Sequence, residues 1–256
     1  MKKLVRLFAL VAMMVIGGQA MAQTRGAMFL GASFPMSDFG EFDGFNEFAL
    51  AQYDESDAGA GIGFNVGLKW YFNVGVEGLG IMLSADGFYN GPNSDLKTAY
   101  RNDNLWYDGW ADIENFSFSS TPKYINVPVM LGINYRYYLN PNFGIYVEAG
   151  AGGNLGLITE METSFDSRVS AIHGKYKVTT NYDKAFSFAY QAGAGIEVAK
   201  NLVVGCSFYH LGSRQVEGNR TMKMVDGNAG PYNESEYLKF GKITPIMVLG
   251  RIGFSF

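Results

Sequence analysis

The sequence predicts an all-β fold: an eight-stranded, antiparallel, up-and-down β-barrel that crosses a membrane. Three observations predict it. The chain contains eight segments in which apolar residues alternate with small or polar ones, the connections between them alternate strictly between short and long, and aromatic residues gather at the segment ends. A high glycine content, 33 of 256 residues, and an aromatic content of 15% agree with this fold class.

Each segment sorts into two faces, because successive side chains of a strand point to opposite sides. One face is apolar and carries no charge. It consists of alternate residues in Met28–Phe34, Ile62–Phe72, Ile81–Tyr89, Ile125–Tyr137, Ile145–Ala151, Phe186–Val198, Leu202–Phe208 and Ile246–Phe256. Alternation alone also fits a soluble β-sandwich, but segments of about 7–13 residues are close to the length of a tilted membrane strand.

The connections predict the orientation. Those after the second, fourth and sixth segments are short and cover residues 73–80, 140–142 and 199–201, whereas the other four run to about 25–30 residues. This alternation is typical of a barrel with short periplasmic turns and long extracellular loops. Compact soluble domains rarely hold four structureless loops of that length, so these connections favour the membrane barrel. In such a barrel we expect the long extracellular loops to lack regular structure.

The second face of the segments carries charged side chains that would line the barrel interior. They are Lys69, Asp86, Arg136, Glu148, Glu197 and Arg251. An eight-stranded barrel encloses a space that side chains fill, and buried charges need partners. Three cations facing three anions therefore predict a paired lumen charge network that plugs the barrel, with all but Asp86 in its periplasmic half. A proton or ion path through the lumen is the alternative.

The first 22 residues have the pattern of a secretory signal peptide. Lys2, Lys3 and Arg6 precede an apolar run at residues 7–16, and Ala20-Met21-Ala22 forms a cleavage site before Gln23. The apolar run is too short for a membrane-spanning helix. We expect residues 1–22 to be removed and residues 23–256 to form one barrel domain. No cysteine adjoins the cleavage site, which excludes a lipoprotein.

Charge and cysteine content exclude other classes. Without the three basic residues of the signal peptide the net charge becomes −7, so nothing favours binding to nucleic acid. A single cysteine, Cys206, rules out an intramolecular disulfide framework. No pattern indicates a cofactor.

Three stretches carry a resemblance to a known family: Gly26–Ala32, Tyr124–Leu131 with a proline inside a strand, and Leu249–Phe256. The chain resembles the small outer-membrane β-barrel domain family that includes the PorT-like proteins. The resemblance implies a location in the bacterial outer membrane. It also implies that Phe254 and Phe256 form the C-terminal signal recognised by the barrel-assembly machinery.

An enzyme is the rival function class. Outer-membrane lipid-modifying enzymes use serine, histidine and carboxylate, and this chain has only His173 and His210. Ser213 follows His210 by three residues, a spacing that turns the two side chains to opposite faces of a continuing strand. We therefore expect a non-enzymatic protein without catalytic residues.

Two connections carry other candidate features. The first, from Pro35 to Ala60, is acidic, but its spacing matches no Ca²⁺ loop, so we expect no metal site. The second carries Trp106, Tyr107 and Trp110, which could contact an envelope protein or surface glycan, or pack the loop against itself.

The resulting hypothesis is a monomeric structural or surface-interaction protein of the envelope, in contact with outer-membrane lipid. An accessory subunit of a secretion machinery is the alternative that the PorT-like resemblance implies.

Overall fold

The computed structural model describes residues 24–40, 58–94, 113–168, 173–199, 201–227 and 232–256. The predicted signal peptide lies outside these residues. Within them, no helix combines the length and apolar character needed to cross a membrane.

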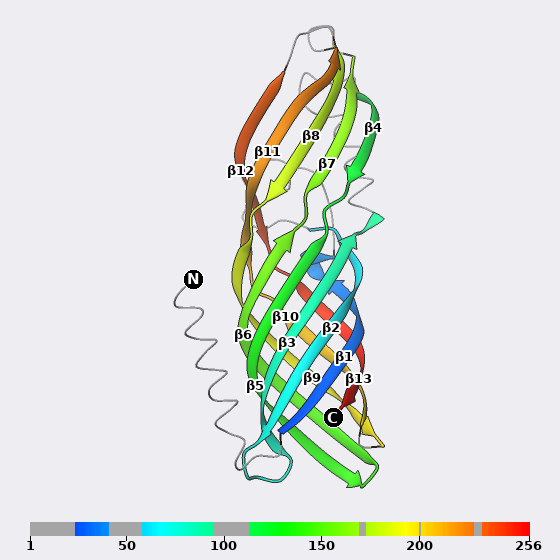
Figure 1. The fold of residues 1–256 in the computed structure, drawn as a ribbon, viewed down its shortest axis with the longest axis vertical. Coiled ribbons are helices and arrows are strands. Elements are labelled where there is room, and N and C mark those ends of the chain that lie inside the picture. The colour runs from blue at the N-terminus through cyan, green and yellow to red at the C-terminus, as the bar shows by residue number, and fades with distance from the viewer. Residues whose placement is uncertain (1–23, 41–57, 95–112, 169–172, 200, 228–231) are drawn as a thin grey trace.

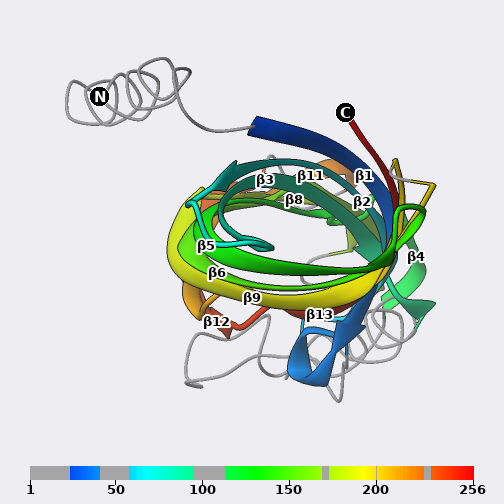
Figure 2. The same ribbon diagram turned by 90° about the horizontal axis from the view of Figure 1, so that it is seen from below.

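Eight strands form one closed antiparallel barrel, as predicted (Figure 1). Around the barrel the order is β1, β13, β10, β9, β6, β5, β3 and β2, and Figure 2 shows the ring from below. The strand bounds are β1 Thr24–Met36, β2 Ala60–Asn73, β3 Leu79–Pro92, β5 Tyr124–Asn140, β6 Phe143–Ile158, β9 Ala185–Val198, β10 Leu202–His210 and β13 Ile246–Ser255.

The first and last barrel strands close the ring. β1 pairs with β13 from Ala27 opposite Ser255 to Met36 opposite Ile246, and with β2 on its other side. The three short connections join β2 to β3, β5 to β6 and β9 to β10 at one end of the barrel, which we call the turn end. The opposite end, from which the long connections leave, is the sheet end.

The prediction that the long connections lack regular structure is wrong for three of the four. They contain β4 Ile113–Ser120, β7 Met161–Ser167, β8 Gly174–Tyr182, β11 Arg214–Gly227 and β12 Asn233–Ile243. These strands form a second, five-stranded sheet in the order β12, β11, β8, β7, β4, which stands beyond the barrel in Figure 1. In the first connection the described residues include a short 3₁₀ helix, η2 Ser37–Phe39.

A local pattern explains this second sheet. In β7, Met161, Thr163 and Phe165 alternate with polar residues and are buried. β7 and β8 form a hairpin in which Phe165 stacks on Tyr176, with ring centroids 5.5 Å apart. The alternation with period two thus continues beyond the barrel and favours strands there. In these strands the backbone N–H and C=O groups form hydrogen bonds with each other and do not need water as a partner.

The two faces of the barrel strands are those that the alternation predicts. The apolar face points outward, where for example Leu30, Ile62 and Leu131 are more than 60% exposed in the absence of lipid. All six predicted lumen charges lie on the inward face. An apolar exterior and a charged interior invert the arrangement of a soluble barrel, as a membrane environment requires.

Candidate functional site

The middle of the lumen holds four charged side chains from four strands: Lys69 on β2, Asp86 on β3, Glu148 on β6 and Arg251 on β13. Arg251 places Nη1 3.3 Å from Asp86 Oδ1 and Nη2 3.1 Å from Glu148 Oε1. Lys69 Nζ forms an ion pair with the same Glu148 oxygen. All four side chains are almost fully buried. Two cations and two carboxylates thus neutralise one another across the interior.

Aromatic and hydroxyl groups complete this central cluster. Tyr209 donates a hydrogen bond to Asp86 Oδ2 over 2.9 Å and accepts one from Arg251 over 3.0 Å. The Arg251 guanidinium also lies 5.0 Å from the ring centroid of Phe29. Gly67 makes room, because a Cβ there would overlap the Asp86 carboxylate. The sequence analysis did not single out Phe29 or Tyr209, although their inward parity could have identified both.

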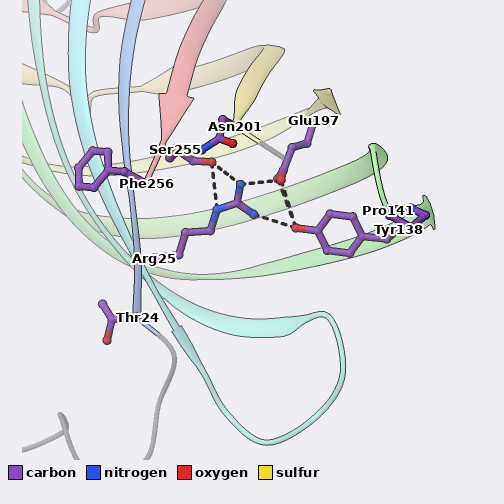
Figure 3. A pocket seen from close by; sticks show the side chains of 8 residues that line it. All are labelled: Thr24, Arg25, Tyr138, Pro141, Glu197, Asn201, Ser255 and Phe256. Carbon is purple, nitrogen blue, oxygen red and sulfur yellow. Dashed lines mark hydrogen bonds and ion pairs between the residues drawn. The ribbon is translucent and has the colours of Figure 1, made fainter. Parts of the chain in front are cut away.

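A second cluster lies at the turn end and is drawn in Figure 3. Arg25 donates to Glu197 Oε1 over 2.5 Å, to the Tyr138 hydroxyl over 2.8 Å and, through Nε, to Ser255 Oγ over 3.0 Å. Arg136 Nη1 lies 3.8 Å from the other oxygen of Glu197. These side chains come from β1, β5, β9 and β13, and all of them except Arg136 line an open pocket of about 620 Å³ at the turn end.

The predicted network therefore consists of two groups of ion pairs. Lys69, Asp86, Glu148 and Arg251 form the central one, and Arg136 and Glu197 belong to the one at the turn end. Tyr71 connects them, since its hydroxyl donates to Glu148 over 3.3 Å and its ring lies 4.0 Å from the Arg136 guanidinium.

Two interior cations were missed. Arg25 precedes the first alternating segment, and Arg214 lies in a connection that we expected to lack regular structure. Among the described interior residues, five cations therefore face three carboxylates, in contrast to the predicted balance of three and three.

The projecting sheet presents a polar outer face and an exposed edge. Five consecutive residues of the edge strand β12, Asn233 to Tyr237, are exposed. On the outer face, Lys177 pairs with Glu162 over 2.7 Å, and this hydrogen bond lowers the pKa of Glu162. Hydrogen bonds to Glu217 and Asp183, both 2.9 Å, raise the pKa of Tyr237. The inner face is apolar, with Phe165 and Tyr176 buried.

The histidines form no catalytic arrangement among the described residues. The His210 ring stacks on Tyr190, with centroids 4.6 Å apart, and its Nδ1 accepts a hydrogen bond from the backbone of Gly212 over 3.2 Å. His173 lines a pocket of the projecting sheet with Asp166 and Lys175. Within the described part of the chain, no group of three potential ligands could hold a metal ion.

The remaining predicted residues have these positions. Phe254 and Phe256 are exposed on the outer surface at the turn end, and their role as an assembly signal stays a prediction. Trp106, Tyr107 and Trp110 lie outside the described residues, as does most of the acidic first connection.

Most of the chain matches one protein family. The model of the outer membrane protein beta-barrel domain family matches residues 8–229. This match does not separate PorT-like proteins from other barrels of the family. No curated protein sequence matches the chain.

Solved structures give distant matches. The attachment invasion locus protein Ail of Yersinia pestis is 16% identical with a TM-score of 0.36, covering 91% of this chain and 98% of that one. A major outer membrane protein of Thermus thermophilus is 12% identical with a TM-score of 0.41, covering 91% and 98%. OprG of Pseudomonas aeruginosa is 12% identical with a TM-score of 0.37, covering 91% and 94%.

Proposed function

Because the chain belongs to the outer membrane protein beta-barrel domain family, we propose that it is a non-enzymatic surface-interaction protein of the bacterial outer membrane that acts through its projecting sheet. The turn end of the barrel then faces the periplasm, and the sheet end faces the outside of the cell. The observation that carries the proposal is the five-stranded sheet itself, which stands beyond the membrane-spanning strands.

Because side chains fill the interior of the barrel, we place the function of the protein outside the lumen. Ion pairs cross the barrel at its centre and again at the turn end, and their side chains are almost fully buried, apart from Arg25 with 24% of its side chain exposed. Eight strands enclose a space that side chains can fill, whereas water-filled porins use 16 to 18 strands. We therefore assign the interior a structural role and place the binding surface on the sheet.

The sheet has two features of a protein-binding surface. Among the described strands, its edge strand β12 has one neighbour, β11, and its residues 233–237 are exposed on both faces. An unpaired edge offers backbone donors and acceptors to an extended segment of a partner. Glu234 and Glu236 on this edge are exposed, which favours a segment with basic side chains.

A binding comparison on whole cells tests the proposal. In one variant, short turns replace residues 160–183 and 214–244, which removes four of the five projecting strands and leaves the barrel strands in place. Cells with the native chain should bind members of a panel of extracellular proteins and glycans, and cells with the sheet-less variant should lose that binding at equal barrel abundance.

A lumen variant, Lys69→Met with Glu148→Gln, is the matched control, because it changes the interior and leaves the sheet intact. It should bind like the native chain. Equal binding by the native and sheet-less chains, or binding by neither, would contradict the proposal.

A further inference from the structure

A buried arginine at the sheet end of the barrel has no carboxylate partner among the described residues. Arg214 is the first residue of β11 and is 5% exposed. Its Nη1 donates a hydrogen bond to Asn126 Oδ1 over 2.7 Å. No described carboxylate lies within ion-pair distance of its guanidinium, whereas every other described interior cation has one. Burial without a counter-charge is costly.

The polar groups around Arg214 also lack partners within the described part of the chain. Arg214 Nη2 and Asn126 Nδ2 are buried donors without an acceptor, and Asn154 Oδ1 is a buried acceptor without a donor. The orientation of Asn154 is fixed, because its Nδ2 donates to Asn126 Oδ1 and to the Leu211 carbonyl, both over 3.2 Å. Asn126 therefore points its oxygen at Arg214 and leaves its own NH₂ unpaired.

The backbone is shaped around this guanidinium. A Cβ at Gly156 would overlap the guanidinium carbon and two of its three nitrogens, Nε and Nη1. Gly156 lies on β6, opposite Asn126 of β5 in the register. The site is thus built from two barrel strands and the start of β11, and any side chain larger than hydrogen at Gly156 would displace the charge.

We propose that Arg214 and Asn126 bind a small oxyanion, a carboxylate or a phosphate, at the sheet end of the lumen. A guanidinium and an amide that each lack one acceptor suit a ligand with two oxygen atoms, and guanidinium recognises such anions through paired hydrogen bonds. The negative charge would also balance the excess of cations in the interior.

The route of entry affects the experiment. Both unpaired donors are sealed from solvent in the unliganded protein. The anion therefore enters while the barrel folds or during a slow local opening, so it should be present during refolding.

Anion-dependent stability tests the site. The mature chain is refolded into detergent micelles with increasing acetate or, separately, inorganic phosphate, at an ionic strength kept constant with a bulky sulfonate. The midpoint of thermal unfolding is followed by tryptophan fluorescence. A ligand that binds only the folded state raises this midpoint with saturable dependence on concentration, by about 5 °C at high occupancy. A response to acetate alone identifies a carboxylate site, and a response to phosphate alone a phosphate site.

Two variants remove the site in different ways, and a third is the control. Arg214→Met removes the charge, and Gly156→Ala displaces it while keeping Arg214, so both should lose the response. Arg168→Met removes a surface arginine paired with Glu114 and should respond like the native chain.

Two results would overturn the proposal. In the first, the native chain responds to neither anion; a response that then appears when Asp54, Glu55 and Asp57 are neutralised would assign the counter-charge to the chain itself. In the second, Arg214→Met and Gly156→Ala retain the full response, as a general salt effect predicts.

Discussion

Arg251 and Glu148 form an ion pair that crosses the lumen, with Nη2 of the arginine 3.1 Å from Oε1 of the glutamate. The two residues lie on β13 and β6, which are three strands apart in the ring. Lys69, from β2, pairs with the same glutamate oxygen. One carboxylate therefore pairs with two buried cations from strands that do not neighbour its own, and Asp86 supplies the second negative charge through its ion pair with Arg251.

Removing this carboxylate should destabilise the barrel strongly. Glu148→Gln keeps the shape of the side chain but leaves Lys69 and Arg251 short of a counter-charge. We expect a loss of about 3–5 kcal/mol in the free energy of unfolding, measured by reversible urea unfolding in detergent, because breaking a buried ion pair leaves a charge uncompensated. Glu162→Gln, at a partly exposed ion pair with Lys177 on the projecting sheet, is the control and should change little.

The pairing itself is tested by a double-mutant cycle. Lys69→Met combined with Glu148→Gln should cost less than the sum of the two single changes, since the second substitution removes a charge that the first has left unpaired. Coupling between contacting residues is typically about 0.5–3 kcal/mol. Additive effects would show that the two side chains do not interact in the folded barrel.

The cluster at the turn end should matter less for stability. Arg25 has 24% of its side chain exposed, so water screens its pairing with Glu197. We expect Arg25→Met to lower the free energy of unfolding by less than Glu148→Gln does, and to lose most of its effect in high salt. An effect as large as that of Glu148→Gln, and independent of salt, would place Arg25 in a drier environment than its exposure indicates.

The filled interior predicts a barrel without steady ion conduction. In planar lipid bilayers the native chain should remain silent. Combined replacement of Lys69, Glu148 and Arg251 by alanine removes the side chains that cross the centre and should produce measurable conductance. Steady conductance by the native chain would contradict the plugged interior and favour the ion path that the sequence left open.

The barrel could be predicted from the sequence because its signal is repeated. Alternation along strands such as Ile125–Tyr137 has one dominant physical cause, a lipid-facing exterior, and it recurs in eight segments. The short turns followed from the same pattern, and the structure confirms all three.

The projecting sheet, two of the interior cations and the pairing of the lumen charges were harder to predict. The alternation in Met161–Ser167 spans only seven residues and mixes methionine, threonine and phenylalanine with charges, so it resembles a polar loop. The residues around Arg214 in the sequence are typical of a loop, and only the structure shows that β11 begins at this residue. Which charges pair depends on register around a closed ring, and register is a tertiary property that spacing along one strand does not determine.

The predicted cleavage site can be tested by measuring the mass of the mature chain. The mature chain purified from outer membranes should begin at Gln23, because the small residues at Ala20 and Ala22 fit a signal peptidase site. Intact-mass analysis of the membrane fraction checks this. A mass that includes residues 1–22 would contradict the prediction.

The orientation of the barrel can be tested with cysteine substitutions in a Cys206→Ser background. Lys223 and Ser235 are exposed on the projecting sheet, whereas Val74 and Asn142 are exposed in two of the turns. A maleimide that does not cross membranes should label cysteines at the first two positions in whole cells and leave the other two unmodified. Lysed cells are the control, where all four should react because all four are exposed to solvent. Labelling of the turns alone in whole cells would show that the barrel has the opposite orientation. Labelling at both ends would show that the cells were not intact or that the barrel inserts in both directions.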